Sequence, residues 1–180
     1  MRFTRHRGRV RADVDAVEVQ VLDQLAAELL EIVEEPQLSD DPLAALVGMS
    51  GEDVPPPDDP VLSRLLPDAY RDDPDASGDF RRYTDGELRQ RKRANAHAVR
   101  RSLPEGGGRL ELDRDQADQW LECLNDMRLA LGTALGVTDE TDPEDIDAEH
   151  PAYASLQVYG WLGWLQESLL SCVEPRQPHA

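Results

Sequence analysis

The two cysteines are the most reactive side chains of this sequence, and their placement leaves two interpretations open. Cys123 and Cys172 lie 49 residues apart, each within an apolar pattern of helical period. This spacing matches neither a zinc-binding pattern nor the disulfide framework of a secreted protein. In the first interpretation both are inert thiols that pack as small hydrophobic side chains. In the second they form a redox pair, which requires that two antiparallel helices bring their Cα atoms within about 7 Å.

A strongly basic segment follows Phe80 and offers a second kind of site. Eight arginines or lysines fall between Arg81 and Arg101, against only Asp85 and Glu87. These cations either pair with the chain's own carboxylates on a solvated face or form a docking surface for an acidic protein or for nucleic acid. Few aromatic side chains interleave with them, so the nucleic-acid signal is weak. The candidate partner-binding residues are Arg89, Arg91, Lys92, Arg93, Arg100 and Arg101.

The other residue types that carry chemistry show no catalytic or metal-binding arrangement. Adjacent carboxylates, as at Asp58 and Asp59, lie in loop-like sequence, where solvation is their simplest role. Gly106–Gly108 follows a helical segment instead of a strand, unlike a phosphate-binding loop. No metal-ligand spacing links the four histidines, which are His6, His97, His150 and His179. We therefore expect no enzyme activity, no cofactor and no metal site.

Composition limits the classes of partner and the compartment. The 180 residues fit one domain, and the formal net charge is −18 with a pI near 4.4. Such a negative field repels phosphate, which disfavours direct DNA binding. The first ten residues, MRFTRHRGRV, lack the apolar run of a signal peptide. The most apolar stretch, Leu156–Val173, contains Gln157 and Glu167, which favours a core helix over a membrane span. We expect a cytoplasmic protein with no membrane segment.

Long helices must position these side chains. Thr84, with Glu87 three residues on, forms a capping box that predicts a helix start at residue 85. The last pattern is apolar nearly all round, which predicts a helix buried at the centre of the fold. Gly160 and Gly163 within it favour the close approach of another backbone, since glycine otherwise weakens a helix. The four predicted long helices span residues 15–34, 85–103, 114–136 and 151–173.

Aspartates mark further helix starts. Asp113 or Asp115 caps the third long pattern. Asp41-Pro42 and Asp59-Pro60 each open a short apolar run, and an aspartate cap followed by proline is a helix start signal. We expect two short helices there, within a partly mobile insertion rich in proline and aspartate at 34–79.

A small amount of β structure completes the predicted fold. Phe3–Val10 forms a short strand or a tight hairpin about Gly8, with its arginines exposed, and Arg109–Leu112 is a second strand that pairs with it. Residues 138–150 form an acidic linker and 174–180 a flexible tail. We therefore expect a mainly α, single-domain helical bundle around a buried C-terminal helix, with a two-stranded β ribbon.

Several blocks of the sequence, taken together, resemble an actinobacterial family long catalogued as a domain of unknown function. Its members are described as AosR-type oxidative-stress regulators and are often encoded beside the protease adaptor ClpS and near genes of cysteine biosynthesis. The resemblance covers nearly the whole chain. The blocks are MRFTRHRGRV, VLDQLAAELLEIV, DPVLSRLLPDAYRDD, FRRYTDGELRQRKR, LNDMRLALGTALGV and YGWLGWLQESLL.

The resemblance implies thiol-based sensing and association with a stress sigma factor or RNA polymerase. The leading hypothesis is therefore a cytoplasmic, non-enzymatic regulator that acts through protein contacts, in which oxidation of Cys123 and Cys172 shifts the packing of the last two helices. The alternative is an adaptor in Clp-type regulated proteolysis that binds Clp components. A third class, direct DNA binding through the basic helix, is disfavoured by the net charge and by the missing helix-turn-helix signature.

Overall fold

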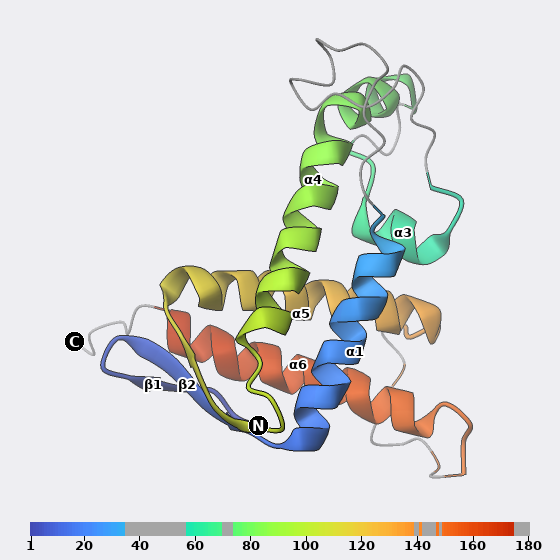
Figure 1. Ribbon diagram of the computed structural model, residues 1–180. Helices are drawn as coiled ribbons and strands as arrows, with labels where there is room; N and C mark the ends of the chain where they lie inside the picture. The colour runs from blue at the N-terminus through green and yellow to red at the C-terminus, as the bar shows by residue number, and fades with distance from the viewer. Residues whose placement is uncertain (35–56, 70–73, 139–140, 142–146, 148, 175–180) are drawn as a thin grey trace, which may run out of the picture.

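The structure is a computed structural model, shown with its regular elements in Figure 1. The short helix predicted after Asp41 lies outside the described residues, as do residues 175–180 of the predicted tail and much of the acidic linker. The described residues are 1–34, 57–69, 74–138, 141, 147 and 149–174.

Helices make up most of the described fold. Two antiparallel helices, α5 (Arg114–Ala134) and α6 (Tyr153–Val173), pack against each other across the molecule in Figure 1. The helices α1 (Ala16–Ile32) and α4 (Pro74–Ser102) cross this pair steeply. The short helix α3 (Pro60–Leu65) packs on α5. This arrangement confirms the predicted mainly α class.

The aspartate caps start their helices as the local sequence predicts. The Asp113 carboxylate accepts a hydrogen bond from the Gln116 amide at 2.9 Å, and the Gln116 side chain accepts one from the Asp113 amide. Asp113 is thus the cap of α5, and Asp115 lies in its first turn. Asp59 accepts from the Leu62 amide at 2.8 Å, with proline as the first helical residue. Each cap satisfies an amide that the helix leaves unpaired, which is worth about 1 kcal/mol.

The sheet has three strands, so the predicted two-stranded ribbon is wrong in strand number. The first segment folds as a hairpin of β1 (Thr4–His6) and β2 (Arg9–Val14), and β3 (Gly108–Leu112) pairs antiparallel with β2. Arg7 and Gly8 turn the chain with φ of 49° and 83°, which fits the tight turns that join paired strands. Strand β2 therefore lies in the middle of the sheet, and the sheet packs on α5 and α6.

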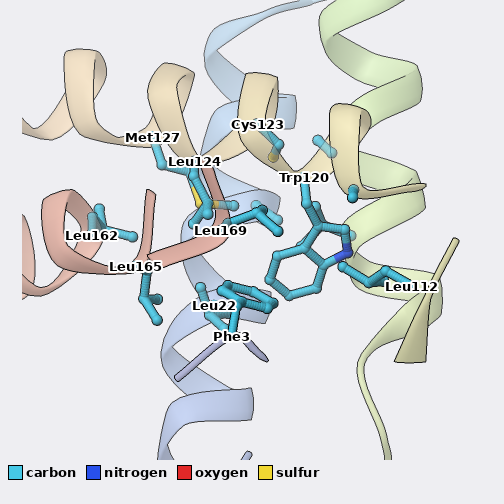
Figure 2. Packing of buried hydrophobic residues seen from close by; sticks show 14 of the residues in the cluster. Phe3, Leu22, Leu112, Trp120, Cys123, Leu124, Met127, Leu162, Leu165 and Leu169 are labelled. Atoms are coloured by element: carbon cyan, nitrogen blue, oxygen red, sulfur yellow. The ribbon is translucent and has the colours of Figure 1, made fainter. Parts of the chain in front are cut away.

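Trp120 of α5 stands at the centre of the buried cluster in Figure 2. It is 1% exposed, and its ring meets that of Phe3 edge-on with 5.7 Å between the ring centroids. The indole N–H donates to the Ser102 hydroxyl at 2.9 Å, so the polar atom of the ring is satisfied. Leu22 of α1 and Leu112 of β3 complete its surroundings. The sheet, α1, α4 and α5 thus meet around one side chain.

Helix α4 begins at Pro74, so the predicted start at residue 85 is wrong. Proline fits the first turn of a helix, and the segment that follows has no other proline before Pro104. Thr84 lies inside the helix, where its hydroxyl donates to the carbonyl of Phe80 at 3.0 Å. The Thr84–Glu87 spacing is therefore not a cap, because the upstream residues continue the helix.

The central helix is α5, and the expectation that residues 151–173 lie at the centre is corrected. α5 contacts α1, α3, α4, α6 and the sheet, whereas α6 contacts chiefly α5, β1 and β2. The outer face of α6 leaves Trp164 and Leu170 each 44% exposed. An apolar pattern around a whole helix does not tell which of its side chains a neighbour covers. None of the described helices combines the length and apolar character needed to cross a membrane.

Candidate functional site

The basic helix α4 turns most of its candidate partner-binding side chains onto this chain. Arg93 donates from Nη1 to the carbonyl oxygens of Leu30 and Val33, at 3.0 Å and 2.9 Å. These carbonyls lie at the C-terminal end of α1, which has no basic residue in its own last turn. Because a helix C-terminus carries partial negative charge, the guanidinium group caps α1 from the neighbouring helix.

Lys92 and Asp126 form an ion pair between α4 and α5. Lys92 Nζ lies 2.6 Å from Asp126 Oδ1, and the two side chains are 12% and 5% exposed. Desolvation raises the pKa of the Asp126 carboxyl above its usual range, although Lys92 favours the charged form. Asn95 donates to Glu122 at 2.8 Å beside this pair. Removing either charge would leave the other buried without a partner, so Lys92 serves the packing of α4 on α5.

The other candidate cations of α4 are mostly paired as well. Arg101 is exposed, and no ion pair joins it to a carboxylate in the described part of the chain. The geometry thus favours pairing with the chain's own groups for five of the six candidates, and a docking role for α4 stays a prediction. Three of these pairs are Arg89 with Asp85 at 2.6 Å, Arg91 with Glu122 at 3.5 Å, and Arg100 with Asp23 at 2.7 Å.

Cys123 is a buried thiol on the side of α5 that faces α4. Its side chain is fully shielded from solvent, and burial raises its pKa to about 12, with the Asp126 carboxylate adding to the shift and Lys92 opposing it. A thiol with this pKa is protonated at neutral pH, and the thiolate is the form that reacts with peroxide. In this conformation Cys123 therefore behaves as a small hydrophobic side chain.

Cys172 lies in the last turn of α6 and is 6% exposed. Its thiol donates to the carbonyl of Ser168 at 3.2 Å. The thiol is therefore held against its own helix, one residue from the helix end. Since helix ends open more readily than helix interiors, Cys172 is the more accessible of the two thiols.

The structure does not bring the two cysteines together. Helix α6 packs on the side of α5 that carries Arg128 and Gly132, which lie beside Gly163 and Tyr159. At about 100° per residue, Cys123 points about 140° and 180° away from these two positions around the axis of α5. Antiparallel packing alone thus does not place the thiols opposite each other, and a bond between them requires rearrangement of the helices.

The remaining candidate groups stay separate. Among the described residues, no three His, Cys, Asp or Glu side chains lie close enough together to hold a metal ion. His6 on β1, His97 on α4 and His150 in the bend before α6 are exposed, and His179 lies outside the described residues.

The arrangement that sequence reasoning missed is a polar hollow beside α3, α5 and α6. Arg64, Arg128 and Tyr159 line it, and the hollow has a volume of about 330 Å³ and is open to solvent on one side. The nearest neighbours of Gly163 are side-chain atoms of Arg128, so the predicted approach of another backbone at this glycine is wrong. The glycines inside two long helices were the available sequence signal, but they do not reveal which side chain fills the space.

The fold and these sites define a mainly α protein with a small antiparallel sheet, buried thiols and a basic helix that is paired largely within the chain. A family profile described as a domain of unknown function, DUF2017, matches residues 1–173. The chain therefore belongs to the DUF2017 family.

Mycobacterial relatives cover most of the chain. A relative from Mycobacterium leprae is 36% identical over 177 residues, which is 90% of this chain and 81% of the relative. The Mycobacterium tuberculosis (strain H37Rv) protein named "Oxidative stress regulator AosR" is 35% identical over 182 residues, or 93% of this chain and 83% of that protein. A Mycobacterium bovis protein of the same name matches over the same shares. No solved structure matches the chain at a significant level.

Proposed function

We propose that this protein is a non-enzymatic regulator of the oxidative-stress response that acts through protein–protein contact. The observation that carries the proposal is the similarity, over about nine-tenths of the chain, to proteins named as oxidative stress regulators. The family resemblance points to a stress sigma factor or RNA polymerase as the partner. This role places the protein in the cytoplasm beside the transcription machinery.

The exposed face of α6 is the surface that best fits such a contact. Trp164 and Leu170 flank this face about 120° apart around the helix axis and are each 44% exposed, and Trp161 next to Trp164 is partly exposed. Tryptophan contributes strongly at protein interfaces because it buries a large, rigid surface with little loss of entropy. The paired cations of α4 are less suited, since a partner would first have to displace their carboxylates.

In this proposal a cysteine thiol reacts only after part of the structure around it has opened. Cys123 is buried and protonated, and it faces away from α6. If peroxide acts directly on this chain, Cys172 reacts first, because the last turn of α6 opens at the lowest cost in free energy. Opening that turn also alters the end of the exposed face that carries Leu170, which links oxidation to partner contact.

The test is recovery of partners from peroxide-treated and untreated cells with the tagged protein. We expect a sigma factor or RNA polymerase to be enriched, with Trp164→Ala weakening the recovery. Val17→Ala is the matched control, because Val17 is 69% exposed on α1, away from α6. Recovery of Clp components in their place would favour the adaptor hypothesis and contradict the proposal.

Two cysteine variants test thiol sensing separately from the proposed protein contact. Cys172→Ser should reduce the response of partner binding to peroxide, and Cys123→Ser should have the smaller effect. An unchanged peroxide response in both variants would remove thiol sensing while leaving regulation by protein contact in place.

A further inference from the structure

The hollow beside α3, α5 and α6 has a charge opposite to that of the chain. Arg64 and Arg128 line it, and no carboxylate does so among the described residues. The chain as a whole carries 37 acidic residues against 19 lysines and arginines. A wall whose described residues include two guanidinium groups and no carboxylate is therefore unusual for this molecule.

Neither arginine of the hollow has a carboxylate partner in the described part of the chain. The ion pairs of α4 show that cations elsewhere in this fold have acidic partners, as Lys92 has Asp126 at 2.6 Å. In contrast, the Nε–H group of Arg128 is buried and donates no hydrogen bond to any of these residues. A buried donor without a partner costs free energy of about 1–3 kcal/mol, and Arg11 Nε is buried in the same way outside the hollow. A ligand in the hollow would therefore be attracted by the charge of the two guanidinium groups, not by this one buried donor.

The position of Arg128 is fixed by its packing. Its guanidinium carbon lies 5.1 Å from the centre of the Tyr159 ring, in a cation–π contact. The ring rests on Gly132, where an added Cβ would lie 2.8 Å from a ring carbon. A glycine inside a helix costs about 1 kcal/mol relative to alanine, and here it lets Tyr159 hold Arg128 at the hollow. Arg128 is thus held in place before any ligand arrives.

The rest of the lining suits a small organic molecule. Leu129 and Val137 supply apolar surface, and Thr133 and Thr138 supply hydroxyl groups. The volume of about 330 Å³ falls at the lower end of the size range of small-molecule sites. The side chains come from α3, from α5 and the turn after it, and from α6, so a ligand would bridge three helices.

We propose that this hollow binds a small organic oxyanion, a carboxylate or a phosphate ester, through Arg64 and Arg128. Guanidinium groups present paired N–H donors that match the oxygen spacing of both anions. Tyr159, Leu129 and Val137 pack against the organic part of the ligand. The site is independent of the thiols and of the exposed face of α6, so it makes the protein a receptor for an anionic metabolite in addition to its proposed contact role.

The experiment is a titration of the purified full chain, followed by amide chemical shifts in NMR. The probes are sodium phosphate and sodium succinate, each added at constant ionic strength against sodium chloride, so that the two arms distinguish phosphate from carboxylate. We expect saturable shifts at the amides of Gly132, Thr133 and Tyr159 with at least one probe, at millimolar concentration. Failure of both probes to give saturable shifts there up to about 50 mM would overturn the proposal.

Two variants of equal charge change make the result specific. Arg64→Gln should weaken the binding about tenfold or more, because a charge-assisted hydrogen bond is lost from an exposed side chain that the fold does not need. Arg101→Gln removes the same charge from α4, outside the hollow, and should leave the binding unchanged. Equal weakening in both variants would mean general attraction of anions and would contradict a built site. Because no partner protein is present, this result is independent of the contact role.

Discussion

Alkylation of the two cysteines in the folded protein tests the account of the thiols most closely. The pKa of Cys123 is about 12, against 9.0 for an unperturbed thiol. At a pH below both values, this difference lowers the thiolate fraction of Cys123 about 1,000-fold. Burial adds to the effect, since the reagent must also reach a side chain that is fully shielded from solvent. We therefore expect Cys123 to react at least about 1,000-fold more slowly than in the unfolded chain.

The assay is timed labelling with iodoacetamide at about pH 8, with the modified peptides quantified by mass spectrometry. Cys172 should be labelled first, because it lies in the last turn of α6 and is 6% exposed. Labelling of Cys123 through its own thiolate should rise about tenfold per pH unit, since all accessible pH values lie below its pKa. Labelling in concentrated urea provides the unfolded rate for each site. If folded Cys123 reacts within about tenfold of that rate, the description of Cys123 as buried and inert is refuted.

Three further predictions concern stability, measured by urea unfolding followed by circular dichroism. Trp120→Ala should lower the free energy of unfolding by about 3–5 kcal/mol, because Trp120 is 1% exposed at the centre of the core, and a loss below about 1 kcal/mol would contradict this role. Lys92→Met should lower the free energy of unfolding by about 3–5 kcal/mol, because it leaves Asp126 buried without a partner. The double variant with Asp126→Leu should recover most of this loss, and a double variant no more stable than Lys92→Met would count against the ion pair. Gly107→Ala should destabilise more than Gly106→Ala, because both have positive φ but only a Cβ at Gly107 would lie 3.0 Å from backbone atoms; equal losses would disprove the close contact.

Sequence patterns predicted the features of the fold that depend on residues close together along the chain. The caps at Asp59 and Asp113 were readable because a cap is made within four residues of chain. The start of α4 was predicted wrongly because a local pattern can resemble a cap when the helix in fact begins further upstream. The Thr84–Glu87 spacing has the form of a cap, but α4 already begins at Pro74, so the helical residues before Thr84 supply the hydrogen bonds that a cap would replace.

Features that depend on tertiary packing were beyond sequence reasoning. The alternating pattern of side chains about Gly8 was consistent with either one strand or a hairpin. The antiparallel pairing of β1 with β2 shows that it is a hairpin, and β3 pairs with the other edge of β2. The apolar pattern of α6 suggested a central helix, but α1 and α4 cross α5 instead, which leaves Trp164 exposed. Which helix becomes central depends on how the others dock, and one helix's own sequence does not contain that information.

The candidate site shows the same division. The sequence predicted that cations of α4 either pair internally or face a partner, and internal pairing holds where partners such as Asp23 lie 77 residues away. The two cysteines were correctly placed within helices, but their faces and register follow from the packing of α5 on α6. The hollow lined by Arg64 and Arg128 went unseen because its side chains come from separate helices.

The most direct test of the proposed function is the transcript response to peroxide in cells that lack the protein. A regulator of the oxidative-stress response predicts that induction of stress genes is lost or strongly reduced without it. Re-expression of the wild-type chain should restore the induction, and Trp164→Ala should restore it less well than Val17→Ala. Normal induction in the deleted strain would contradict the central claim.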